Sequence, residues 1–270
     1  MVSSLAAWPL PVVALGVALA MTTLVWIASL AKKDASIIDV FWGLGFVLLG
    51  WVYFAAGDGQ ALRQPLVVGL VTVWGARLSL HILWRNWGRG EDYRYREMRE
   101  KSPAAFPLRS LLSVFWLQAL LLWAISMPLY QVQRRSEPLA LTLLDLVALA
   151  LFLLGFVFEA GGDWQLARFK RDPANQGLVM NRGLWRYTRH PNYFGDAVVW
   201  WSFFCFAAAT PGGWWTLVSP LLMTLLLMRV SGVTLLEKKL EQTRPAYREY
   251  VERTSAFFPW WPADRGSRRR

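Results

Sequence analysis

Long runs of apolar residues alternate along this chain with short polar segments. Each run approaches the roughly 20 residues that an α-helix needs to cross a bilayer. This pattern predicts an all-α, polytopic membrane protein with about seven transmembrane helices in a single membrane domain, residues 1–270. The expected spans are 11–31, 37–56, 65–85, 110–131, 139–160, 195–210 and 214–231, followed by a cytoplasmic amphipathic tail at 232–270.

The last two apolar runs are shorter than the others. Thr210-Pro211-Gly212-Gly213 joins them, and consecutive Pro and Gly residues favour a tight turn. The sequence therefore predicts a helical hairpin here, with helices that can fall short of the full bilayer thickness.

Composition supports a membrane protein and argues against several soluble classes. Hydrophobic residues make up 55% of the chain, with 17 Trp and 15 Phe, which is unusual for a soluble domain of 270 residues. The single cysteine, Cys205, excludes an internal disulfide, and the two histidines lie in different segments, so no metal site is expected. The glycine-rich nucleotide loops of soluble dinucleotide-binding and ATP-binding folds are absent from the sequence.

The distribution of basic residues predicts the topology. Lys and Arg number 2 in 32–36, 7 in 85–109, 6 in 161–194 and 10 in 229–270, whereas the alternate loops hold only Arg63, Arg134 and Arg135. Basic residues concentrate in the cytoplasmic loops of membrane proteins. We therefore expect the N-terminus outside and the C-terminus in the cytoplasm. The net charge of +11 then reflects topology, and no nucleic-acid partner is expected.

The most informative polar segment is Arg182–Asp196, which leads into the sixth expected span. Pro191 suits the first turn of a helix, and the free N–H groups of a helix N-terminus bind anions. The basic residues that crowd the same place are Arg182, Arg186, Arg189 and His190. Asn192 and Asp196 are four residues apart, on one helical face, and suit ribose or amide groups. A basic loop that binds lipid headgroups explains the arginines but not Asn192, Tyr193 and Asp196, so a ligand site is favoured.

A second polar group ends the fifth expected span. It consists of Glu159, Asp163, Arg168 and Lys170, around Gly161-Gly162. These residues suit either structural ion pairs with close helix packing or a ligand site, and the sequence leaves both open.

Ionisable residues inside a membrane span are costly, so each is a functional candidate. Asp39 lies near the start of the second span, and Arg77 and His81 lie four residues apart on the third. We expect Asp39 either to pair with Arg77 or His81 for structural reasons or to act as an acid beside a substrate. Tyr93 and Tyr95 follow the third span and are either interfacial anchors or donors that polarise a carbonyl.

The segment Gly183–Asp196 resembles the C-terminal signature of the steroid 5-alpha-reductase-like membrane proteins, and most of all their bacterial branch of largely unassigned function. Ile38–Gly43, Glu91–Tyr95 and Leu235–Leu240 are similar to other blocks of that branch, so the resemblance covers 35–262. It implies seven membrane helices, NADPH held at the cytoplasmic face, and hydride delivery to the β-carbon of an enone. The implied substrate is a steroid or another lipid, and the implied location is the bacterial inner membrane.

The resemblance also implies roles for individual residues. Asp39 stands near the family's catalytic acid, and the donor is expected to be Tyr93, Tyr95 or His81, because the family's catalytic Tyr on the third span is replaced here. The resemblance and the basic motif together give the expected cofactor-binding residues. These are Asp163, Arg168, Lys170, Leu184, Tyr187, Arg189, His190, Asn192, Tyr193, Asp196 and Arg229. A His and a Tyr that these relatives use after the seventh span are also replaced, near Val233 and Glu237. NADPH binding is therefore better supported than steroid reduction.

A second resemblance competes with the first. Arg189-His190-Pro191-x-Tyr193-x-Gly195 is similar to the motif of isoprenylcysteine and phospholipid methyltransferases, and Glu237 and Tyr247–Tyr250 match their tail. Those enzymes bind S-adenosylmethionine, and methyl transfer needs alignment but little acid–base help. The polar set Asp39, His81, Tyr93 and Tyr95 therefore favours reduction. A methyltransferase of a lipid or prenylated substrate and a non-enzymatic lipid-binding protein remain the alternatives.

Overall fold

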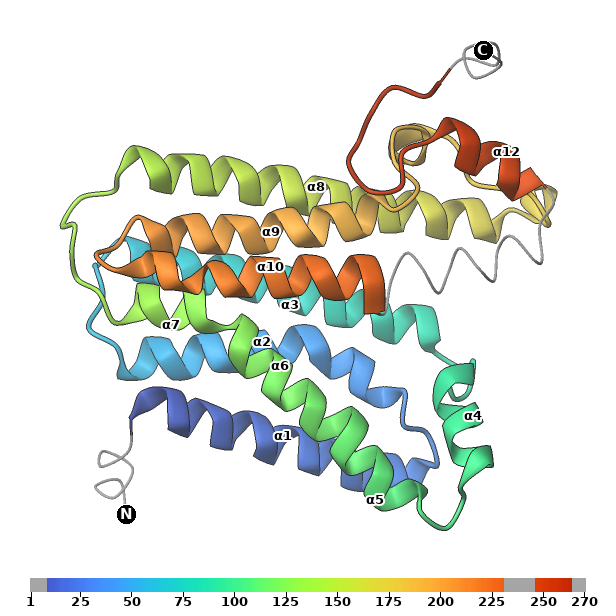
Figure 1. Ribbon diagram of the computed structural model, residues 1–270, viewed down its shortest axis with the longest axis horizontal. Helices are drawn as coiled ribbons and strands as arrows, with labels where there is room; N and C mark the ends of the chain where they lie inside the picture. The colour runs from blue at the N-terminus through green and yellow to red at the C-terminus, as the bar shows by residue number, and fades with distance from the viewer. Residues whose placement is uncertain (1–8, 231–245, 264–270) are drawn as a thin grey trace. The chain divides into compact units, whose positions relative to one another are not determined.

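The computed structural model describes residues 9–230 and 246–263 (Figure 1). Within these residues the chain forms helices joined by turns, with no strand and one isolated bridge between Thr188 and Ser255. The all-α class expected from the sequence is confirmed. The chain divides into two compact units. The first comprises Met1–Thr142 and Phe206–Thr216, and the second comprises Leu143–Cys205 and Leu217–Arg270.

The first unit is built on long apolar helices that pack side by side (Figure 1). They are α1 (Leu10–Lys32), α2 (Ile37–Ala56), α3 (Arg63–Asn86) and α6 (Leu117–Ile125). Helix α1 ends where Lys33 adopts a left-handed conformation, with φ 53°. The N–H groups of Lys33 and Asp34 then bond to the carbonyls of Leu30 and Ser29, which closes the helix and turns the chain into α2.

The segment between α3 and α6 is shorter and more irregular. The polar helix α4 (Tyr93–Lys101) follows α3, and α5 (Phe106–Ser110) continues through a π-helical turn, Leu111–Trp116, into α6. Helix α7 (Met127–Gln133) completes the fourth apolar run, which the sequence predicted as one helix over 110–131. Its second residue is Pro128, which lacks an N–H group and is favoured in a first helical turn.

The second unit contains α8 (Leu143–Arg171), α9 (Pro191–Ala208) up to Cys205, α10 (Val218–Leu225) and α12 (Ala246–Arg253). The prediction that a helix begins at Pro191 is confirmed. Helix α8 runs 29 residues and passes through Gly161-Gly162, so it continues beyond the expected span of 139–160. The glycines do not stop the helix because they lie against its neighbours. A Cβ added at Gly162 would lie 3.1 Å from Pro191 Cγ.

Five described helices are long and apolar enough to cross a membrane. They are Leu10–Lys32, Ile37–Ala56, Arg63–Asn86, Phe106–Ile125 and Leu143–Arg171. They match the first five predicted spans and indicate a multi-pass membrane protein. The runs at 195–210 and 214–231 are not among them. Helix α9 has 18 residues including Asn192 and Asp196, and α10 has 8 residues before a π-helical turn. Of the predicted tail, 232–245 and 264–270 lie outside the described residues.

Close packing of α2 on α3 gives a testable prediction. A Cβ added at Gly43 would lie 2.4 Å from the carbonyl oxygen of Gly75, which is too close for any side chain. We expect Gly43→Ala to lower the free energy of unfolding by about 2 kcal/mol, because the two helices must move apart. Thermal unfolding of the purified protein measures this. Gly69→Ala on α3 is the matched control, since nothing lies within 4 Å of its added Cβ. Equal losses in both variants would contradict the packing argument.

Candidate functional site

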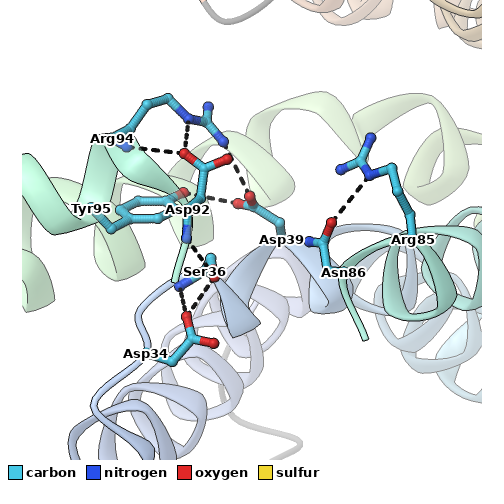
Figure 2. A network of polar contacts seen from close by, with 8 residues as sticks. All are labelled: Asp34, Ser36, Asp39, Arg85, Asn86, Asp92, Arg94 and Tyr95. Atoms are coloured by element: carbon cyan, nitrogen blue, oxygen red, sulfur yellow. Dashed lines mark hydrogen bonds and ion pairs between the residues drawn. The ribbon is translucent and has the colours of Figure 1, made fainter. Parts of the chain in front are cut away.

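Asp39 is the centre of a polar network at the start of α2 (Figure 2). The Tyr95 hydroxyl donates a hydrogen bond to Asp39 Oδ1 at 2.8 Å. Arg94 Nη2 lies 3.3 Å from Asp39 Oδ2 and forms an ion pair with it. The Asp39 side chain is 21% exposed, so one carboxylate holds two partners from α4 while part of its surface stays accessible.

Helix α4 is positioned by its own N-cap. Asp92 accepts a hydrogen bond from the N–H of Arg94 at 3.0 Å and another from Arg94 Nε at 2.9 Å. The N–H of Asp92 in turn donates to Ser36 Oγ, in the turn before α2, at 3.3 Å. This capping arrangement starts the helix and directs the Arg94 guanidinium towards Asp39.

A second tether holds α4 at Glu91. Glu91 Oε1 accepts from the N–H of Ala35 at 2.8 Å and from Arg99 Nη2 at 2.7 Å. Burial raises the pKa of Glu91, but the hydrogen bonds from Arg99 and Ala35 outweigh it and hold that pKa below its ordinary value. The Arg99 guanidinium also lies 4.1 Å from the centre of the Phe106 ring. These contacts tie both turns of α4 to the start of α2 and α5.

Tyr95 keeps its proton in this environment. Its side chain is 7% exposed and packs in an apolar cluster with Ile38 and Phe106. Burial raises the pKa of Tyr95, and the negative charge of Asp39 raises it further. At neutral pH the phenol is therefore a neutral hydrogen-bond donor.

The structure separates the candidate donors that the sequence left open. Tyr93 is 37% exposed, and the His81 ring lies 6.0 Å from that of Trp84. Neither bonds to Asp39, whose partners are Arg94 and Tyr95. Of the two alternatives left open for Asp39, the pairing with Arg77 or His81 is not among its described contacts, which come from α4.

The second unit holds the other candidate group, where α8 lies beside α9. Asn192 Nδ2 donates to Asp163 Oδ1 at 3.1 Å. Asn192 Oδ1 is buried and has no hydrogen-bond partner in the part of the chain that the structure describes. Glu159 and Asp196 are also buried, at 2% and 8% exposure. A Cβ added at Gly195 would lie 2.3 Å from the N of Glu159, so glycine allows the close approach of these two helices.

Arg189 does not join the other basic residues at the start of α9. Its Nη1 donates to the carbonyls of Val251 at 3.1 Å and Thr254 at 2.6 Å, at the end of α12. Its N–H donates to the carbonyl of Ser255 at 2.9 Å, and its side chain is 8% exposed. Sequence reasoning missed this contact, since nothing in the motif indicates carbonyls more than sixty residues later.

The remaining predicted residues are spread around this region of the second unit. Arg168, Lys170 and Arg229 are exposed, and Arg168 lies over the Trp164 ring at 5.6 Å. The N–H of Leu184 donates to Gln165 at 3.0 Å, and the Tyr187 ring contacts that of Trp261 at 5.4 Å. His190 is buried and stacks on Tyr193 at 5.5 Å. The structure thus brings together Asp163 and Asn192, while these other side chains have different neighbours.

The groups at the start of α9 are hydrogen-bond donors and acceptors. Among the described residues, no group of three or more His, Cys, Asp or Glu side chains is placed to hold a metal. The first turn of α9 offers N–H groups, Asn192 offers an unpartnered oxygen, and Asp163 offers a carboxylate. Groups of these types form hydrogen bonds with the hydroxyl and amide groups of organic ligands.

Comparison with known proteins gives a family but no activity. An uncharacterized protein of Schizosaccharomyces pombe is 28% identical over 274 residues, which cover 92% of this chain and 79% of that protein. No solved structure matches. The model of a family described as "Protein of unknown function (DUF1295)" matches residues 25–254. Because this match spans most of its length, the chain belongs to the DUF1295 family.

Proposed function

We propose that this protein is an NADPH-dependent membrane oxidoreductase that reduces the C=C bond of a hydrophobic enone, a steroid or another lipid. The observation that carries the proposal is the hydrogen bond from Tyr95 to Asp39, with Arg94 beside it. Reduction of an enone places negative charge on the carbonyl oxygen, and a fixed donor lowers the barrier by stabilising that charge. Methyl transfer has no such requirement.

The geometry supports a specific role for each residue. The neutral phenol of Tyr95 donates its hydrogen bond to a substrate carbonyl when one takes the place of the carboxylate as acceptor. Asp39 then keeps its ion pair with Arg94. The carboxylate therefore stays paired with a cation when Tyr95 changes its acceptor. With hydride added at the β-carbon, the enolate oxygen stays hydrogen-bonded to Tyr95, and a proton from water adds at the α-carbon to give the saturated ketone.

The fit to a cofactor rests on the second unit. Asp163 and Asn192 are joined at 3.1 Å, and the free Asn192 oxygen at the α9 N-terminus suits an amide or ribose donor. When bound, NADPH supplies the hydride. The role of the other expected cofactor-binding residues stays a prediction.

The proposal includes a topology. We place seven spans in a single membrane domain, with the N-terminus outside and the C-terminus cytoplasmic, in the inner membrane of a bacterium. The five apolar helices and the uneven distribution of Lys and Arg support this arrangement. The steroid 5-alpha-reductase-like motifs support it as a resemblance.

Measuring cofactor binding to the detergent-purified protein tests the proposal. We expect NADPH to bind and S-adenosylmethionine not to bind in calorimetric titrations. Asn192→Ala should weaken NADPH binding about 10-fold, because one or two hydrogen bonds are lost. The matched control is Gln176→Ala, an exposed amide in the loop after α8. Binding of S-adenosylmethionine alone would replace the proposal with a methyltransferase, and binding of neither would favour a non-enzymatic lipid-binding protein.

A further inference from the structure

A pocket of about 640 Å³ lies between the loop after α8 and the helix α12, within the second unit. Its lining combines apolar side chains with arginines: Phe169, Leu178, Arg182, Arg186 and Arg253. Arg182 and Arg186 come from the basic segment before α9, but none of these five residues is among the eleven expected above to bind the cofactor. The volume falls in the range of about 300–1,000 Å³ that small-molecule sites occupy.

The charges on this pocket are unbalanced. Among the residues that the structure describes, Glu249 is the one carboxylate in its lining, and it lies 3.7 Å from Arg253 Nη1. Arg253 Nε also donates to the carbonyl of Ala263 at 3.2 Å. By contrast, Arg182 and Arg186 have no carboxylate partner within the described ranges of the chain. Arg182 and Arg186 thus line the pocket without an ion-pair partner among the described residues.

The walls of the pocket are held in place independently of any ligand. The Tyr250 hydroxyl, from α12, donates to the carbonyl of Trp185 at 2.5 Å. Gly183 turns the loop with φ 57°, a conformation that side chains disfavour, and so places Arg182 and Arg186 on either side of this turn. A pocket whose walls are already fixed loses little entropy on binding.

We propose that this pocket is a second ligand site, which binds a phosphate-bearing molecule with an apolar portion. Arginine guanidinium groups bind phosphate oxygens through paired, charge-assisted hydrogen bonds. Phe169 and Leu178 provide an apolar surface next to them. A free phosphate compound and the headgroup of an anionic lipid share this chemistry, so the test must separate the two sources.

The test uses the full-length protein in detergent and two probes. One is inorganic pyrophosphate, and the other is dioctanoyl phosphatidic acid below its micelle concentration; calorimetry measures both affinities. We expect at least one probe to bind, and Arg182→Gln with Arg186→Gln to weaken it about 10-fold or more. The control is Arg109→Gln with Arg248→Gln, which removes the same charge from exposed positions outside the pocket.

Each outcome bears on the site. Binding of pyrophosphate identifies a free phosphate ligand, and binding of the lipid alone identifies a headgroup. Absence of binding of both probes, or equal weakening in both double variants, would overturn the proposal. Probe binding must stay unchanged when NADPH is present at saturation, and its loss would show that the pocket is no separate site. Because the probes and NADPH are titrated separately, failure of this site and failure of the reductase proposal are distinguishable.

Discussion

Asp39→Asn is expected to lower kcat for NADPH-dependent enone reduction by about 100-fold or more, with the Kd of NADPH unchanged. The substitution keeps the size of the side chain but removes the charge that pairs with Arg94 and accepts from Tyr95. Tyr95→Phe should cause a loss of similar order, since it removes only the donating hydroxyl. Steady-state kinetics with an enone substrate and calorimetry with NADPH give the two quantities.

The same network also has a plain structural explanation, in which it only ties α4 to α2. Glu91→Gln separates the two explanations, because it weakens the neighbouring tether to Ala35 and Arg99 without touching Asp39. We expect this variant to unfold at a lower temperature and to keep its kcat. If it lost as much kcat as Asp39→Asn, or if Asp39→Asn also lost NADPH binding, the assigned role would be refuted.

Arg189→Met is expected to release the C-terminal segment from the second unit. Arg189 Nη1 bonds to two carbonyls at the end of α12, and hydrogen bonds from charged groups each contribute about 1.5–3 kcal/mol. We therefore expect the free energy of local opening of α12 to fall by about 3 kcal/mol. Hydrogen exchange of the α12 amides measures this quantity.

Two further variants make the Arg189 experiment specific. Arg248→Met removes an exposed arginine from α12 itself and should leave exchange unchanged. Arg189→Lys keeps the charge but not the planar group, so it should restore only part of the protection. Unchanged exchange in Arg189→Met would show that the two carbonyl contacts contribute little.

The helical class and the first five spans follow from the sequence, because hydropathy over about 20 consecutive residues is a local property. The start of α9 at Pro191 is also local, since proline is favoured in a first turn whatever surrounds it. The position at which α8 ends does not follow from the local sequence. Gly161-Gly162 have low helix propensity, but the structure has α8 continuous through them to Arg171, with Gly162 close to Pro191.

The sequence also nominated Asp39 and Tyr95 but could not choose among their partners. It offered Arg77 and His81 as partners of Asp39, since they lie four residues apart on one face of the third span. Helical spacing reveals only which residues share a face of one helix, not what that face meets. The structure pairs Asp39 with Arg94 and Tyr95 instead. They follow it by 55 and 56 residues, and only the return of α4 towards the start of α2 brings them near.

The network at Asp39 depends both on residues that the sequence supplies and on contacts that only the tertiary structure makes. From the sequence alone, Tyr93 and Tyr95 were equivalent candidates for the donor that polarises a carbonyl together with Asp39. Residues two apart on a helix point in different directions, so only one of Tyr93 and Tyr95 can face the acid. The packing of α4 directs Tyr95, which is 7% exposed, towards Asp39, whereas Tyr93 is 37% exposed. The sequence thus determined which residue types were available, and tertiary packing alone decided which of them meet.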